Sequence, residues 1–275
     1  MPLSSAIVGA SSLLPLPAVS VCAVCDSSES NGKALAAALE CPWYPSPQAM
    51  LTAQPCLEAL WLRPDGNGNL PFDPLMLAAY GRHIFLDLSL PMTHELYTQM
   101  ASTASAKGAI LHAVLPAIPA LPSLGEIYAV EVRGFTDENT LSPLDHLPLS
   151  LNQGLSVLLS LCGTARQVQG SFDTSATARL TGYSGPDKLG LLISFYSGII
   201  GQLLLLPASD SVEPGWTITV TGSEGCYSFR LPSDSIPTRT DEIPSVCDPT
   251  LYPTLLSLRN GISASFRQGG CAISI

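Results

Sequence analysis

The chain contains few charged residues and few aromatic ones. Asp, Glu, Lys and Arg make up only 12% of its 275 residues and aromatic residues 7%, whereas apolar residues make up 46%. Twelve Lys and Arg stand against twenty-two Asp and Glu, a formal net charge of −10, and the sequence has no cluster of basic residues. A negative surface repels phosphates, so nucleic acid is excluded as a partner. The length suffices for one large domain or two medium ones.

Signals for export or for the membrane are also missing. The first 25 residues are apolar but contain no Lys or Arg, and a secretory signal begins with positive charge. The uncharged run 189–208 is long enough to span a bilayer, but its Ser197-Gly198 pair divides it into two strand-length pieces. We interpret this run as a buried β-hairpin, with a membrane-attached structural protein as the alternative. The sequence predicts a cytoplasmic protein without membrane contact.

The sequence contains eight cysteines but only one C-x-x-C pair, Cys22 and Cys25. The pair lies in an apolar strand-like stretch, where residues three apart point to opposite faces. No second pair and no paired histidines follow at the spacing of metal ligands. We interpret these cysteines as buried free thiols of a reducing compartment, with a zinc or redox site as the alternative.

The first part of the chain alternates between strand-like and helix-like stretches. Strand patterns cover 5–10, 18–25, 56–64, 82–88 and 109–116, and helix patterns cover 32–40, 45–52, 73–81 and 93–108. Thr93 is the predicted N-cap of the last of these helices. This alternation predicts an α/β domain with a doubly wound parallel sheet.

The second part has a different pattern, which begins after the proline-rich stretch 116–125. Strand patterns cover 126–135, 166–173, 188–196, 199–206, 216–222 and 226–232, and helix patterns cover 149–163 and 253–266. Consecutive strands with few helices are typical of an α+β domain with a mostly antiparallel sheet. We therefore predict two domains, residues 1–118 and 119–275.

Five phrases, in the same order along the chain, resemble the glucose–fructose oxidoreductase/inositol dehydrogenase (Gfo/Idh/MocA) family. They are AVSVCAVCD (18–26), CLEALWLRP (56–64), GRHIFLDLSLPMT (81–93), GEIYAVEVRG (125–134) and WTITVTGSEGCYSFRL (216–231). The resemblance implies a Rossmann-like NAD(P)-binding domain followed by an α+β domain with an open, mostly antiparallel sheet. It also implies hydride transfer to or from sugars and related polyols, and a homo-oligomer or protein partner bound through the C-terminal sheet.

The cofactor motifs of the family are reduced in this chain. Of its G-x-G-x-x-G only Gly9 remains, and the residues up to Pro17 are too few for the helix whose N-terminus binds the pyrophosphate. Ser11 is left as a donor to a phosphate. Asp26 occupies the place of the acid that accepts from the ribose hydroxyls, its alternative role being a turn or helix cap. The sequence predicts that NAD(P) binding is weak or lost.

Arg63 and Pro64 begin the loop 63–72, which stands where the family has a T-P-x-x-x-H turn, and we predict that they line the cofactor site. Residues 65, 67 and 69 of this loop, Asp-x-Asn-x-Asn, also resemble the first half of a calcium loop. Leu70 and Met76 stand where such a loop needs glycine and glutamate. We therefore predict no metal site.

The catalytic positions of the family are replaced. Its Glu-Lys-Pro strand end reads Asp87-Leu88-Ser89 here, and leucine cannot transfer a proton. The position of its catalytic histidine aligns with Gln153, which hydrogen-bonds but does not take up a proton near neutral pH. A shifted alignment would recruit His146 instead. The candidate catalytic residues are therefore Asp87, Gln153 and His146.

Two functional hypotheses follow from these replacements. The first is a non-catalytic protein of oxidoreductase fold: a partner subunit, a sensor or a binder of a small polar ligand. The second is a divergent but active NAD(P)-dependent oxidoreductase that acts on a sugar-like or imine substrate. Losing the phosphate cradle, the lysine and the histidine together favours the first, because cofactor binding, proton transfer and positioning then fail together.

Overall fold

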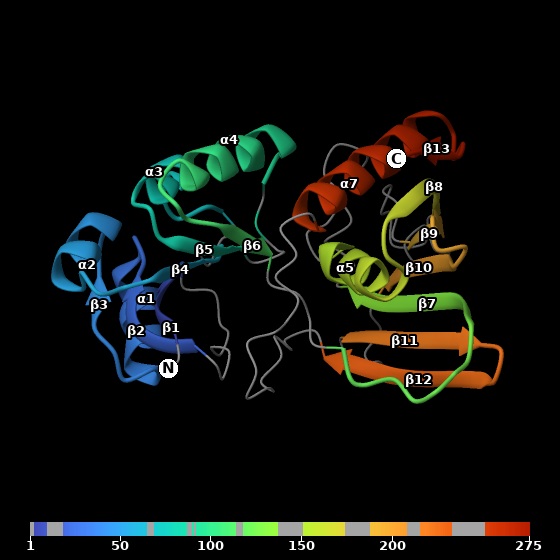
Figure 1. The fold of residues 1–275 in the computed structure, drawn as a ribbon, viewed down its shortest axis with the longest axis horizontal. Helices are drawn as coiled ribbons and strands as arrows, with labels where there is room; N and C mark the ends of the chain where they lie inside the picture. The colour runs from blue at the N-terminus through green and yellow to red at the C-terminus, as the bar shows by residue number, and fades with distance from the viewer. Residues whose placement is uncertain are drawn as a thin grey trace, which may run out of the picture. The chain divides into compact units, whose positions relative to one another are not determined.

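The computed structural model describes residues 3–9, 19–64, 69–86, 90, 92–113, 118–136, 151–173, 188–207, 215–232 and 251–275 (Figure 1). The chain divides into two compact units. The first comprises Met1–Ala117 with Ile236–Pro253, and the second comprises Ile118–Ser235 with Thr254–Ile275. The domains predicted from the sequence, 1–118 and 119–275, place this boundary one residue further along the chain and differ in assigning Ile236–Pro253 to the second domain.

The first unit contains a sheet of six described strands, all parallel. The strands are β1 (Leu3–Val8), β2 (Val19–Cys25), β3 (Trp43–Tyr44), β4 (Ala59–Leu62), β5 (His83–Leu86) and β6 (Leu111–Ala113). Their order is β3-β2-β1-β4-β5-β6. This is the strand order of the doubly wound dinucleotide-binding fold, in which the direction of winding reverses between the first and fourth strands. The predicted α/β fold class is confirmed.

The helices of this unit begin where short polar side chains cap them. They are α1 (Glu29–Ala38), α2 (Pro47–Ala53), α3 (Pro74–Ala79) and α4 (His94–Ser105). Their N-caps are Ser28, Ser46, Asp73 and the predicted Thr93, and each side chain accepts a hydrogen bond from a backbone N–H of the first turn. Helix α1 packs its Ala36 on a face of the sheet that carries Ile7, Val24 and Trp61, whereas α3 and α4 pack against each other (Figure 1).

The second unit contains a sheet of seven described strands. They are β7 (Ile127–Thr136), β8 (Ala165–Asp173), β9 (Lys188–Phe195), β10 (Ile200–Pro207), β11 (Gly215–Gly222), β12 (Gly225–Pro232) and β13 (Ile273–Ser274). Their order is β12-β11-β7-β10-β9-β8-β13, and every neighbouring pair is antiparallel except β7 with β10. The predicted open, mostly antiparallel sheet is therefore present.

Strands β9 and β10 are the two halves of the long uncharged run. They pair in antiparallel register, from Leu189 opposite Leu205 to Ser194 opposite Ile200, and Gly198 turns between them with a φ of +85°. The predicted hairpin is confirmed, but it is buried on one face only, because Leu192 is 50% and Ile200 43% exposed. Of the helices in the described residues, none is both long and apolar enough to cross a membrane.

Two helices cover one face of this sheet, α5 (Leu151–Cys162) and α7 (Leu251–Arg267). Alternate residues of the strands are buried beneath them, such as Val130 and Val132 on β7 and Leu203 and Leu205 on β10. The residues between them face the other way and are mixed in character: Glu131 and Arg133 form an ion pair, and Leu192 is 50% exposed. One face therefore forms the core of the unit.

Ser265 connects α7 to the sheet and to the C-terminal strand. Its side chain is fully buried. The hydroxyl accepts from the Gly170 N–H of β8 at 3.0 Å and donates to the Cys271 carbonyl oxygen at 2.6 Å. One hydroxyl thus satisfies two backbone groups, of which the Gly170 N–H lies in the interior without water.

We expect Ser265→Ala to lower the free energy of unfolding of the second unit by about 1–3 kcal/mol, because it leaves the buried Gly170 N–H without its acceptor. Ser257→Ala is the matched control, since Ser257 lies on the exposed side of the same helix. Urea denaturation followed by circular dichroism measures both. Equal stability of the two variants would contradict the assigned role of Ser265.

Candidate functional site

The carboxyl ends of β1 and β4 form the point where the strand order reverses, which is where ligands bind in open α/β sheets. Gly9 follows β1 with a φ of +105°. A Cβ at this position would overlap the Arg63 carbonyl and lie 3.0 Å from the Pro64 carbonyl oxygen. The structure therefore brings three predicted cofactor-binding residues together, Gly9, Arg63 and Pro64.

These three residues are nevertheless buried. The Gly9 N–H donates to the Cys25 carbonyl oxygen at 3.0 Å, and the Arg63 N–H donates to the Val8 carbonyl oxygen at 2.8 Å. Arg63 is only 2% exposed, and Pro64 is buried as well. Their backbone groups extend the hydrogen bonding of the sheet beyond the ends of the strands.

Asp26 follows β2 and has the role of a turn residue. It is 1% exposed. Its carboxylate oxygen accepts from the Ser28 N–H at 2.6 Å, immediately before α1 begins. Its backbone N–H donates to the Tyr44 carbonyl oxygen, and its own carbonyl oxygen accepts from the Trp43 indole at 3.2 Å each. Of the two alternative roles considered for Asp26, the turn role is therefore present, whereas Ser28 is the helix cap.

The role of Trp43 was not predicted from the sequence. Its indole lies against Gly32 of α1 and donates to the Asp26 carbonyl oxygen. Its indole occupies the space of a side chain at Gly32, where a Cβ would overlap the ring. The Lys33 ammonium lies 5.4 Å from the ring centroid and pairs with Glu29 at 2.6 Å, which lowers the pKa of the Glu29 carboxyl. The predicted helix pattern began at Gly32, so it did not indicate that this glycine lies inside α1.

Gln153 lies in the first turn of α5, in the second unit. Its side-chain oxygen accepts a hydrogen bond from the Trp216 indole of β11 at 3.0 Å. Trp216 is 5% exposed, whereas Gln153 is half-buried. This contact could not be predicted from the sequence, because the two residues are 63 positions apart.

The other predicted site residues lie outside the described residues. They are Ser11, Asp87 and His146, together with Leu88 and Ser89 of the replaced catalytic motif. Asp65 and Asn67 of the calcium-like loop also lie outside them.

The described cysteines are free thiols, and two of them are deeply buried. Burial raises the pKa of Cys25 to about 12, with a further contribution from the Asp26 charge, and burial also raises the pKa of Cys162 to about 12. Cys22 is half-buried and lies 3.4 Å from the Ser4 hydroxyl. Within the described ranges, no three His, Cys, Asp or Glu residues are grouped as a metal site would need.

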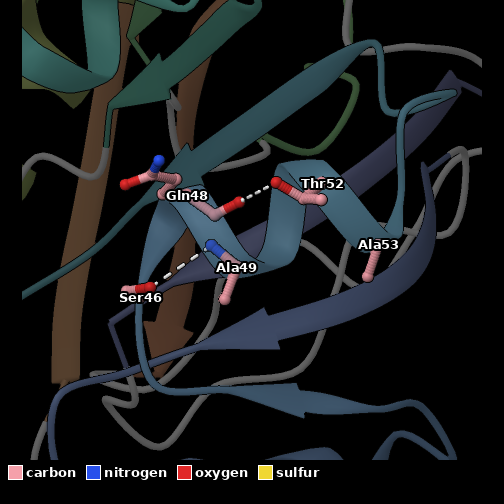
Figure 2. Close-up of a pocket in the computed structure, with 5 residues that line it drawn as sticks. All are labelled: Ser46, Gln48, Ala49, Thr52 and Ala53. Carbon is pink, nitrogen blue, oxygen red and sulfur yellow. Dashed lines mark hydrogen bonds between the residues drawn. The ribbon is translucent and has the colours of Figure 1, made fainter.

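A surface depression of about 400 Å³ lies along α2 and is lined by Ser46, Gln48, Ala49, Thr52 and Ala53 (Figure 2). The Ser46 hydroxyl accepts from the Ala49 N–H at 3.3 Å, and the Thr52 hydroxyl donates to the Gln48 carbonyl oxygen at 2.8 Å. Both hydroxyls therefore form hydrogen bonds with the backbone of α2. The lining residues include no acid, base or thiol, so we do not assign chemistry to this depression.

The comparisons with known proteins show the fold. No family model matches the chain, and no curated protein matches its sequence. The solved structures that it resembles include the WlbA dehydrogenase from Bordetella pertussis in complex with NADH and UDP-GlcNAcA, at 16% identity and a TM-score of 0.70, with 100% of this chain and 99% of that one covered.

Two further structures give the same TM-score of 0.70. One is a putative myo-inositol dehydrogenase from Sinorhizobium meliloti 1021, at 14% identity with 99% of both chains covered. The other is myo-inositol 2-dehydrogenase from Lactobacillus plantarum, at 12% identity with 100% of both chains covered. The chain therefore has the fold of the Gfo/Idh/MocA-type dehydrogenases, as the resemblance in the sequence predicted.

We expect Cys25 and Cys162 to resist alkylation at pH 8 while Cys56, Cys226 and Cys271, which are exposed, react. The reactive species is the thiolate, and a thiol with a pKa near 12 is ionised in only about one molecule in ten thousand at pH 8. Iodoacetamide labelling of the folded protein followed by peptide mass spectrometry measures this. The urea-denatured chain, in which all the thiols should react, is the control, and rapid labelling of Cys25 in the folded protein would contradict the assignment.

Proposed function

We propose that this chain is a Gfo/Idh/MocA-like protein whose cofactor and catalytic motifs have degenerated, and that it acts without catalysis as a partner subunit, a sensor or a binder of a small polar ligand. The observation that carries the proposal is the short connection between β1 and β2. A dinucleotide fold uses this connection to present a helix N-terminus to the pyrophosphate.

The length of the connection is set by the pairing of the two strands. They run parallel, with Leu3 opposite Val19 and Val8 opposite Cys25, so the chain must return along the whole of β1 before β2 begins. Six strand residues span roughly 20 Å, and a helix of that length needs about 13 residues. Residues 9–18 number only ten and must also supply the turns at both ends.

The burial of Asp26 and Arg63, at the carboxyl ends of the parallel strands, supports the same proposal. Asp26 and Arg63 are 1% and 2% exposed, and one carboxylate oxygen of Asp26 caps the turn before α1. For a ribose to bind the Asp26 or the Arg63 side chain, that side chain would first have to give up interactions that it makes within the protein. We infer that NAD(P) binding is weak or lost, although the fold is one that binds it in structures such as that of WlbA with NADH.

The residues at the two positions that align with the family's catalytic lysine and histidine also support the proposal. The Gln153 amide has no pKa near neutrality and therefore cannot remove a hydroxyl proton. Leu88 stands where the family has its lysine. A proton released by a hydride-transfer step would have neither of the two usual acceptors.

We further propose that the sheet face carrying Leu192, Gln202 and Glu131 contacts a second copy of the chain or a partner protein. This face lies opposite the helices and mixes apolar and polar side chains, as interfaces between subunits commonly do. The cytoplasmic location expected from the sequence stays a prediction.

A divergent active oxidoreductase is the second candidate, favoured by the retained strand order and by Gly9 beside Arg63. Asp87 and His146 would then carry the proton transfer on a sugar-like or imine substrate. If this candidate holds, Asp87→Ala and His146→Ala lower a measured turnover by at least about a hundredfold.

We expect isothermal titration with NADH and with NADPH to give dissociation constants weaker than about 1 mM, because residues 9–18 are too few for a helix that returns along β1. Asp26→Asn should leave this weak binding unchanged and lower the melting temperature, since the weaker acceptor still faces the Ser28 N–H. Micromolar binding together with oxidation of myo-inositol or another polyol would overturn the proposal.

A further inference from the structure

We draw no further inference here: the strongest candidate, the cluster of the Phe85, His83 and His112 rings on one face of β5 and β6, includes a buried His83 nitrogen without a hydrogen-bond partner, but nothing among the described residues shows which ligand or chain segment would cover it.

Discussion

The parallel pairing of β1 with β2 constrains the cofactor end of the first unit more than any other interaction. The register from Leu3–Val19 to Val8–Cys25 fixes where one strand ends and the next begins. The ten residues 9–18 must cover that distance, and Gly9 is tied to the Cys25 carbonyl at the first step. A helix that spans the length of β1 needs about 13 residues, more than the ten between these two strands.

Two tryptophans whose contacts were not predicted, one in each unit, are packed in the same way: each ring lies against glycine and each indole N–H donates a hydrogen bond. Trp43 fills the space left by Gly32 and donates to the Asp26 carbonyl, whereas Trp216 fills the space left by Gly134 and Gly154 and donates to Gln153. In both, an indole N–H donates to an acceptor at a position that the family resemblance marks as functional. A buried indole needs such a partner, and its size makes the contact rigid.

The fold could be predicted because its signals are local. Helix caps such as Thr93 and the turn at Gly198 depend on neighbouring residues, and the alternation of strands with helices identifies a parallel sheet without any knowledge of contacts. The two-residue strands β3 and β13 were missed because so short a stretch has no period. The contact between Gln153 and Trp216 was missed because tertiary packing alone brings these residues together.

Residues that contact only a ligand add little to the stability of a fold, so the scaffold is compatible with the degenerate site that we propose. A phosphate loop or a proton-transferring lysine contacts ligand, so replacing it removes no core packing. Gln153 is different, because its oxygen satisfies the Trp216 indole and its neighbour Gly154 admits the ring. An apolar residue at position 153 would leave a buried donor unpaired, at a cost of about 1–3 kcal/mol. The hydrogen bond to Trp216 therefore favours a polar acceptor at position 153 for stability alone.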